Sequence, residues 1–182
     1  MKKNTKIVLG TKNEINPLNE IEYIDLVDEN NNVIGITDAK TAHEKKQYHR
    51  VVAVLLFDNK DKLVLQSGTK YNKLEMSVGG HVMHGESYED AVHREMFEEI
   101  MVKTKLLHLS TFLPENNKMG HFWSIYEGRV PENWEFKKTE EVKSIVRVSL
   151  EEVFKKIKEE PELFTHGSIN IINEYKKIKN IK

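Results

Sequence analysis

The sequence contains no cysteine, and this absence excludes several kinds of site at once. A disulfide framework, a thiolate zinc site and a cysteine nucleophile all need the missing residue. No apolar run approaches the length of a membrane-spanning helix, and the basic start Met1–Lys3 is followed by only three consecutive apolar residues, Ile7–Leu9. A secretory signal or a membrane-spanning helix needs a longer apolar stretch, so we expect a soluble protein of the cytoplasm.

Neither sign of charge dominates the chain. Its 28 basic and 29 acidic side chains leave a net charge of −1. This balance gives no general electrostatic reason to bind duplex nucleic acid or a membrane surface. It still permits a small anionic ligand, because a local metal ion can reverse the sign of one cleft. A length of 182 residues suits one buried core.

The hydrophobic pattern predicts a single mixed α/β domain over residues 21–182, after a loosely ordered lead-in over residues 1–20 that has one short strand at Lys6–Leu9. Strands are expected at Glu22–Val27, Val33–Thr37, His49–Phe57, Lys62–Gln66, Glu75–Val82, Lys105–Leu113, His121–Tyr126 and Glu141–Val148. Helices are expected at Asp38–Gln47, Ser87–Ile100, Leu150–Glu159 and Ser168–Ile178. The first two strands form a predicted hairpin, and Lys62–Gln66 is the predicted antiparallel partner of the buried run His49–Phe57, with a loop at Ser67–Leu74.

The helix predicted at Ser87–Ile100 carries the clearest chemical signal. Glu95, Glu98 and Glu99 stand at i, i+3 and i+4, which places three carboxylates on one helical face. Carboxylates this close repel one another unless a positive charge neutralises them. Oxygen-rich clusters of this kind suit Mg²⁺ or Mn²⁺, which also bind phosphate oxygens. The simplest alternative is a solvated face in a chain rich in Glu and Lys.

A wider spacing argues against that alternative. Six residues fit Gly-x5-Glu-x7-Arg-Glu-x-x-Glu-Glu, namely Gly80, Glu86, Arg94, Glu95, Glu98 and Glu99. Average residue frequencies make this match a roughly 10⁻⁷ event per starting position. The segment resembles the signature of the Nudix hydrolase superfamily. Its one departure is Met101, where the family usually has the glycine that ends the helix in a left-handed conformation.

The resemblance implies a Nudix-type α/β/α sandwich with a mixed central sheet and a metal-dependent hydrolysis of a diphosphate bond. The substrate would be a nucleoside diphosphate derivative or a similar small organic diphosphate. Mg²⁺ or Mn²⁺ would bind the three box glutamates and the Gly79 carbonyl, while Arg94 would hold the glutamates through Glu98 and Glu86. Glu95 is the first choice as general base, followed by Glu141 or its neighbour Glu140.

Other residues near the box are candidates for binding the substrate. Gly80 and His81 follow the bend that lets the backbone approach a ligand. Lys70 and Lys73, in the loop before the box, can meet phosphate groups, although ordinary loop lysines are the favoured interpretation.

A second resemblance, over roughly residues 20–160, is to the branch that contains type 1 isopentenyl-diphosphate isomerases. In those isomerases three histidines build a metal site, and His43, His49 and His81 fall at or near the matching places. The isomerase's catalytic cysteine corresponds to Gly79, and its Glu-x-Glu pair is replaced near Met119 and His121. We therefore expect hydrolysis rather than isomerisation.

Individually, the histidines have alternatives. His43 is expected on a helix surface, His49 is expected either to make a structural hydrogen bond or to bind metal, and His81 is expected to line the cleft. The other hypotheses for function are an enzyme acting on isoprenoid diphosphates and a non-catalytic module that kept the fold. A homodimer is compatible with the family, and the sequence does not decide it.

Overall fold

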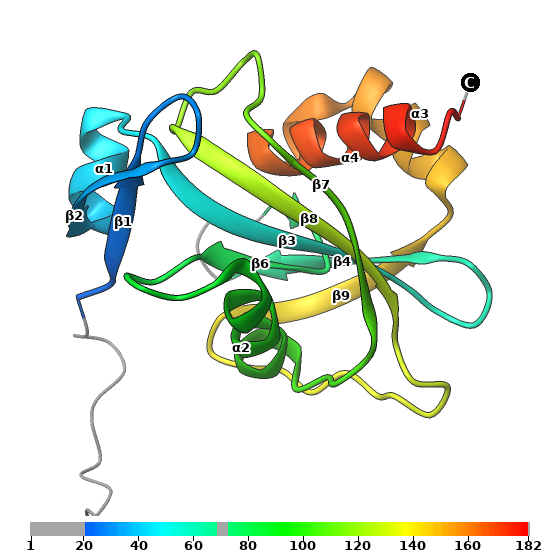
Figure 1. Cartoon of the computed structure of the whole chain (residues 1–182). Helices are drawn as coiled ribbons and strands as arrows, with labels where there is room; N and C mark the ends of the chain where they lie inside the picture. The colour runs from blue at the N-terminus through cyan, green and yellow to red at the C-terminus, as the bar shows by residue number, and fades with distance from the viewer. Residues whose placement is uncertain (1–20, 69–72, 182) are drawn as a thin grey trace, which may run out of the picture.

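The computed structural model describes residues 21–68 and 73–181. A mixed sheet forms the middle of the molecule, and its central strand is β3 (His49–Phe57) (Figure 1). β3 pairs in parallel with β8 (His121–Arg129) and antiparallel with β6 (Val78–His81). All of β3 except Arg50 is buried, which confirms the prediction of a central strand covered on both faces.

The N-terminal part of the described chain is the predicted hairpin. β1 (Tyr23–Val27) and β2 (Val33–Asp38) pair antiparallel, and β1 meets β3 where Leu26 lies opposite His49. Helix α1 (Ala39–Lys45) follows directly, with the Asp38 side chain accepting a hydrogen bond from the Thr41 amide. The sequence prediction of a helix capped by Asp38 is confirmed.

The predicted pairing of the strand after β3 is only partly right. β4 (Leu63–Gly68) faces β3 at one pair, Phe57 and Leu63, and then diverges. Along its length β4 pairs antiparallel with β9 (Val142–Val148) and, at its end, with the short β5 (Leu74–Glu75). The hairpin signal was local, whereas the long partner comes from a segment far away in the sequence.

Helices cover both faces of the sheet (Figure 1). The alternation of β3 sends Val52, Val54 and Leu56 towards α2 (Tyr88–Ile100). Val51, Ala53 and Leu55 point to the other face, which is covered by the remaining helices. The elements on this face are α3 (Leu150–Glu159), the 3₁₀ turn η2 (Pro161–Leu163) and α4 (His166–Ile178). The remaining strand, β7 (Leu106–Phe112), pairs antiparallel with β8. The predicted α/β/α sandwich with a mixed sheet is confirmed.

Helix α2 ends at the residue where the box departs from its usual glycine. Met101 adopts the left-handed conformation itself, with φ of 56°, and its amide bonds back to the carbonyls of Met96 and Phe97. The helix therefore ends as a glycine would end it, at the steric cost of a side chain in this region.

Several predictions fall on residues that are not described. The lead-in over residues 1–20, its strand at Lys6–Leu9, and Lys70 lie outside the described residues. Among the helices of the described ranges, none combines the length and apolarity that crossing a membrane would require.

Candidate active site

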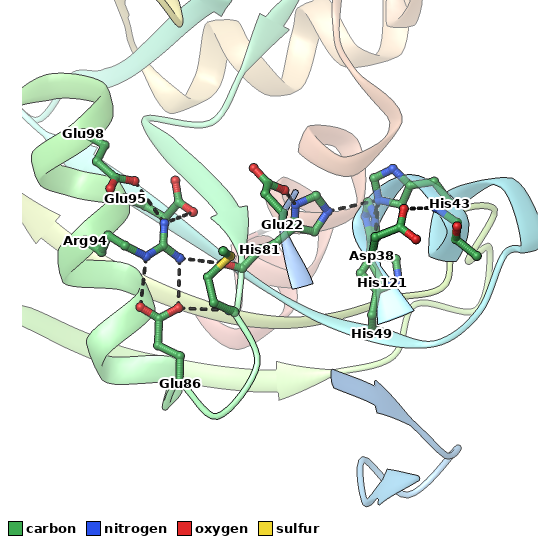
Figure 2. A network of polar contacts seen from close by, with 12 residues as sticks. Glu22, Asp38, His43, His49, His81, Glu86, Arg94, Glu95, Glu98 and His121 are labelled. Carbon is green, nitrogen blue, oxygen red and sulfur yellow. Dashed lines mark hydrogen bonds and ion pairs between the residues drawn. The ribbon is translucent and has the colours of Figure 1, made fainter. Parts of the chain in front are cut away.

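Arg94 on α2 binds the acidic side chains of the box together. Its Nη1 donates to Glu95 Oε1 at 2.7 Å and to Glu98 Oε2 at 3.0 Å. Its Nε and Nη2 donate to Glu86 at 3.0 and 2.9 Å, and Nη2 also donates to the carbonyl oxygen of His81 at 2.8 Å. Figure 2 shows the guanidinium between these carboxylates, so the arginine fixes three of the four box glutamates relative to β6.

The glycine pair of β6 lies against two of the box glutamates, Glu99 and Glu95. Glu99, which is buried, accepts hydrogen bonds from Gln66 Nε2 at 2.8 Å and from the Gly79 amide at 3.2 Å. At Gly80, a Cβ atom would overlap the carboxylate of Glu95. Gly80 therefore makes room for a catalytic candidate, a reason for glycine that differs from the substrate contact expected of it.

The electrostatics of this cluster favour a cation. Burial raises the pKa of Glu95 to about 7, although Arg94 opposes the shift. Burial and repulsion from Glu95 raise the pKa of Glu99 well above its ordinary value. Two buried carboxylates that resist ionisation are the donor set expected to gain most from a divalent ion. The side chain of Glu98 is 48% exposed, so the cluster also has an opening to solvent.

Glu141, just before β9, belongs electrostatically to the same cluster. Partial burial and repulsion from Glu98 and Glu22 raise its pKa. Repulsion from Glu141 also contributes to the raised pKa values of Glu95 and Glu99. Both residues of the predicted pair are exposed, and Glu141 is the one whose charge is coupled to the box.

A cavity of about 570 Å³ lies next to the box on the α4 side of the sheet. It shares Gln66, Gly79 and Gly80 with the contacts of Glu95 and Glu99, although these carboxylates do not form its wall. Its apolar wall consists of Val51, Ala53, Met76, Met119, Trp123 and Ile171. Lys73, a predicted substrate-binding residue, lines this cavity, and so does His166, for which the sequence predicted no function.

At another end of this cavity, four histidines converge. His43 comes from α1, His49 from the start of β3, His81 from the end of β6 and His121 from the start of β8. One ligand atom from each lies within 4.8 Å of the others. The prediction that His43 is a surface residue is wrong, because α1 packs back over the strand ends and turns this side chain inward (Figure 2).

The hydrogen bond predicted for His49 is present, and the ring still faces the cluster. Its Nδ1 lies 2.7 Å from the Gln47 carbonyl oxygen, and its Nε2 lies 3.1 Å from His43 Nε2. Burial lowers the pKa of His49 to about 4 and also lowers that of His121. His81 Nδ1 lies 2.8 Å from Glu22 Oε2, and this hydrogen bond lowers the pKa of Glu22.

Sequence reasoning missed two members of this group, His121 as a possible ligand and Glu22 as a partner. A signal was available, because His49 and His121 both begin predicted strands. Their parallel pairing, together with the antiparallel pair Val51 and His81, brings three strand ends to one edge.

A mixed sheet with helices on both faces, and an arginine-ordered cluster of glutamates beside a glycine pair, are the features expected of the Nudix hydrolase class. The chain belongs to the Nudix family, since the model of the NUDIX domain matches residues 47–166. It is 31% identical to isopentenyl-diphosphate Delta-isomerase 2 of Photorhabdus laumondii, over 84% of this chain and 91% of that protein. It is also 31% identical to the prenyl-diphosphate phosphatase of Methanosarcina mazei, over 81% of this chain and 94% of that protein.

Solved structures agree on the fold. The crystal structure of DR0079 from Deinococcus radiodurans superposes with a TM-score of 0.70 and 24% identity, covering 84% of this chain and 98% of that one. The MutT protein from Methanosarcina mazei gives a TM-score of 0.59 at 21% identity, over 74% and 96% of the two chains. The family, its named relatives and the fold identify the chain as a Nudix hydrolase, an enzyme class that generally uses a divalent metal ion.

Proposed function

We propose that the chain hydrolyses a small organic diphosphate with Mg²⁺ or Mn²⁺ held by Glu95, Glu98, Glu99 and the carbonyl of Gly79. The observation that carries the proposal is the pair of buried carboxylates, Glu95 and Glu99, whose pKa values are raised beside the glycine pair. When bound, the ion would offset charge on the phosphate oxygens and activate water.

Each residue of the box has a distinct part in this proposal. Arg94 is a positioning residue, because it touches Glu86, Glu95 and Glu98 at hydrogen-bonding distance. Glu95 is the first choice as general base, since a pKa of about 7 allows it to accept a proton near neutral pH. Glu141 is the second choice, because it is coupled to the same carboxylates.

The cavity favours an isoprenoid-type group over a nucleoside as the organic part of the substrate. Most of the surface that the cavity exposes is apolar and suits a hydrocarbon chain, although polar side chains such as Gln66 and Thr165 also line it. The relative named prenyl-diphosphate phosphatase, which matches nearly its whole length, supports the same choice. The diphosphate would then lie at the mouth, near Gly79, Gly80 and Lys73.

Isomerisation is not proposed, although several relatives are named as isomerases. The resemblance assigns the catalytic cysteine to the place of Gly79, and the chain contains no cysteine at all. The box glutamates that serve hydrolysis are all present. The expected products are therefore the organic monophosphate and phosphate, with one oxygen supplied by water, and not a rearranged diphosphate.

The direct test is hydrolysis of a panel that includes isoprenoid diphosphates, nucleoside diphosphate derivatives and inorganic diphosphate, with and without Mg²⁺ or Mn²⁺. Products are identified by mass spectrometry. We expect metal-dependent turnover that is fastest with isoprenoid diphosphates. Faster turnover of nucleotide derivatives would contradict the proposed substrate class, and metal binding without hydrolysis of any member would favour a non-catalytic binding module.

Two further expectations stay predictions. A homodimer is common among related enzymes and would be detected by light scattering. A cytoplasmic location follows from the sequence expectation alone and would be checked by fractionation.

A further inference from the structure

The four histidines meet through their ring nitrogens rather than through their ring faces. His43 Nε2 lies 3.1 Å from the Nε2 of His49, 3.1 Å from that of His81 and 3.2 Å from that of His121. One nitrogen thus makes three short contacts with three other nitrogens. Figure 2 shows this group on the far side of Glu22 from the Arg94 cluster.

These contacts cannot all be hydrogen bonds. The Gln47 carbonyl can only accept, so His49 Nδ1 carries the proton in their 2.7 Å contact, and its Nε2 presents a lone pair. The Glu22 carboxylate likewise accepts from His81 Nδ1, at 2.8 Å, and leaves the Nε2 of His81 as a lone pair. His43 Nε2 holds at most one proton, so it can satisfy only one of its three neighbours.

A cation among the nitrogens would satisfy all of them. A metal–nitrogen distance of about 2.0–2.1 Å places neighbouring ligands about 3.4 Å apart in a tetrahedron and about 3.0 Å apart in an octahedron. The three separations from His43 Nε2, 3.1 to 3.2 Å, fall between these values, and the ligand atoms of all four histidines lie within 4.8 Å of one another. The bonds of His49 and His81 to Gln47 and Glu22 are also the outer contacts that orient metal-binding histidines.

His121 is held in place by its own surroundings. Its amide donates to Asn117 Oδ1 at 2.8 Å, and its ring stands edge-on to Trp123 with centroids 5.2 Å apart. The preceding Gly120 has φ of 78°, and a Cβ there would collide with the Gln47 carbonyl. The turn before β8 therefore places Gly120, the residue before this imidazole, against the same backbone oxygen that orients His49.

We propose that His121 completes a centre of four imidazoles, separate from the carboxylate centre, and that it makes this centre selective for a first-row transition-metal ion such as Zn²⁺, Co²⁺ or Ni²⁺ over Mg²⁺. The resemblance to the isomerases supplies only the other three histidines and has acidic residues near this place. Four nitrogen donors without a carboxylate suit imidazole-preferring ions and disfavour Mg²⁺, which seeks oxygen ligands. His43, His81 and His121 line the cavity, so the ion would face it.

The test uses the full chain, stripped of metal and without substrate, so that its outcome does not depend on the proposed hydrolysis. Co²⁺ is titrated and followed by its visible absorption, which reports nitrogen coordination, and Zn²⁺ and Mg²⁺ are then added as competitors. We expect one equivalent of Co²⁺ in this band, displacement by stoichiometric Zn²⁺, and no displacement by Mg²⁺ in large excess.

Three variants assign the site. His121→Ala should weaken Zn²⁺ binding on the order of 100-fold, whereas His93→Ala, which removes an exposed histidine of α2, should leave it unchanged. His121→Glu should keep a metal site but let Mn²⁺ and Mg²⁺ compete. Thermal melts of the metal-free variants identify any variant that fails to fold. If His121→Ala fails to fold, the metal selectivity of His121→Glu decides whether the inference holds.

The inference is overturned if His121→Ala binds Zn²⁺ as tightly as the wild type. It is equally overturned if the Co²⁺ band is lost on replacing Glu98 and Glu99 by glutamine, because the ion would then occupy the carboxylate centre. If His121→Glu still excludes Mn²⁺ and Mg²⁺ as the wild type does, His121 does not set the metal selectivity of this centre.

Discussion

Replacing Glu95 by glutamine should stabilise the metal-free protein while it abolishes turnover. Glu95 is 8% exposed, and burial raises the pKa of its carboxyl group from 4.5 to about 7. The folded state therefore holds a proton that the unfolded state releases between these two pH values. Unfolding is favoured progressively as pH rises through this window, and the loss of stability is complete above about pH 7.

The size of the effect follows from the two pKa values. The difference between 4.5 and about 7 corresponds to about 3 kcal/mol of lost stability at pH 8, and most of it appears between pH 5 and pH 8. Glutamine carries no charge at any pH and can still accept the hydrogen bond of Arg94. The variant should consequently resemble the wild type near pH 4.5 and become the more stable protein at pH 8.

Urea denaturation with EDTA at pH 5, 6, 7 and 8 measures this difference. The matched control is Glu98→Gln, which removes a carboxylate bound to the same arginine but 48% exposed, and it should show a much smaller change with pH. If the stability of Glu95→Gln relative to the wild type does not change with pH, burial does not raise the pKa of this carboxyl group.

Three further predictions concern the box and its metal. Gly80→Ala should abolish turnover, because the added Cβ would overlap the Glu95 carboxylate. Gly79→Ala should keep more activity, because its Cβ would meet only the Val52 carbonyl oxygen at 3.3 Å. Equal turnover rates in the two variants would contradict this interpretation. Met101→Gly should raise the free energy of unfolding by about 1 kcal/mol by relieving the left-handed conformation, with little change in rate, as seen by parallel denaturation and activity assays. Adding millimolar Mg²⁺ at pH 8 should raise the melting temperature of the wild type more than that of Glu95→Gln. An equal rise in both proteins would show that Glu95 does not bind the ion.

Much of the fold could be predicted because its signals are local. The helix with its cap at Ser87, the buried run at His49–Phe57 and the capped helix after Asp38 are written in consecutive residues. The box itself was visible because five of its side chains lie on or beside one helix. Even the helix end was predicted within a residue, since Met101 simply takes the glycine's conformation.

The rest depends on pairings between distant segments. Nothing in the sequence of β4 shows that it pairs along its length with β9, which follows much later in the chain, rather than with β3. The histidine cluster has the same origin, because it draws on α1 and three strands whose register only the folded sheet establishes. His43 was misjudged since its helix was assessed alone, without the sheet edge that it covers.

The central claim is that the carboxylates of α2 hold a metal ion that is required to cleave a diphosphate bond. Its most direct measurement is the steady-state rate against Mg²⁺ concentration for the wild type, Glu98→Gln and Glu99→Gln, with a substrate found in the panel and ¹⁸O-labelled water. We expect ¹⁸O in one of the two phosphate-containing products, a rate that saturates with Mg²⁺, and a loss of at least about 100-fold in Glu99→Gln. Turnover that is unchanged in both variants, or that needs no metal, would contradict the claim.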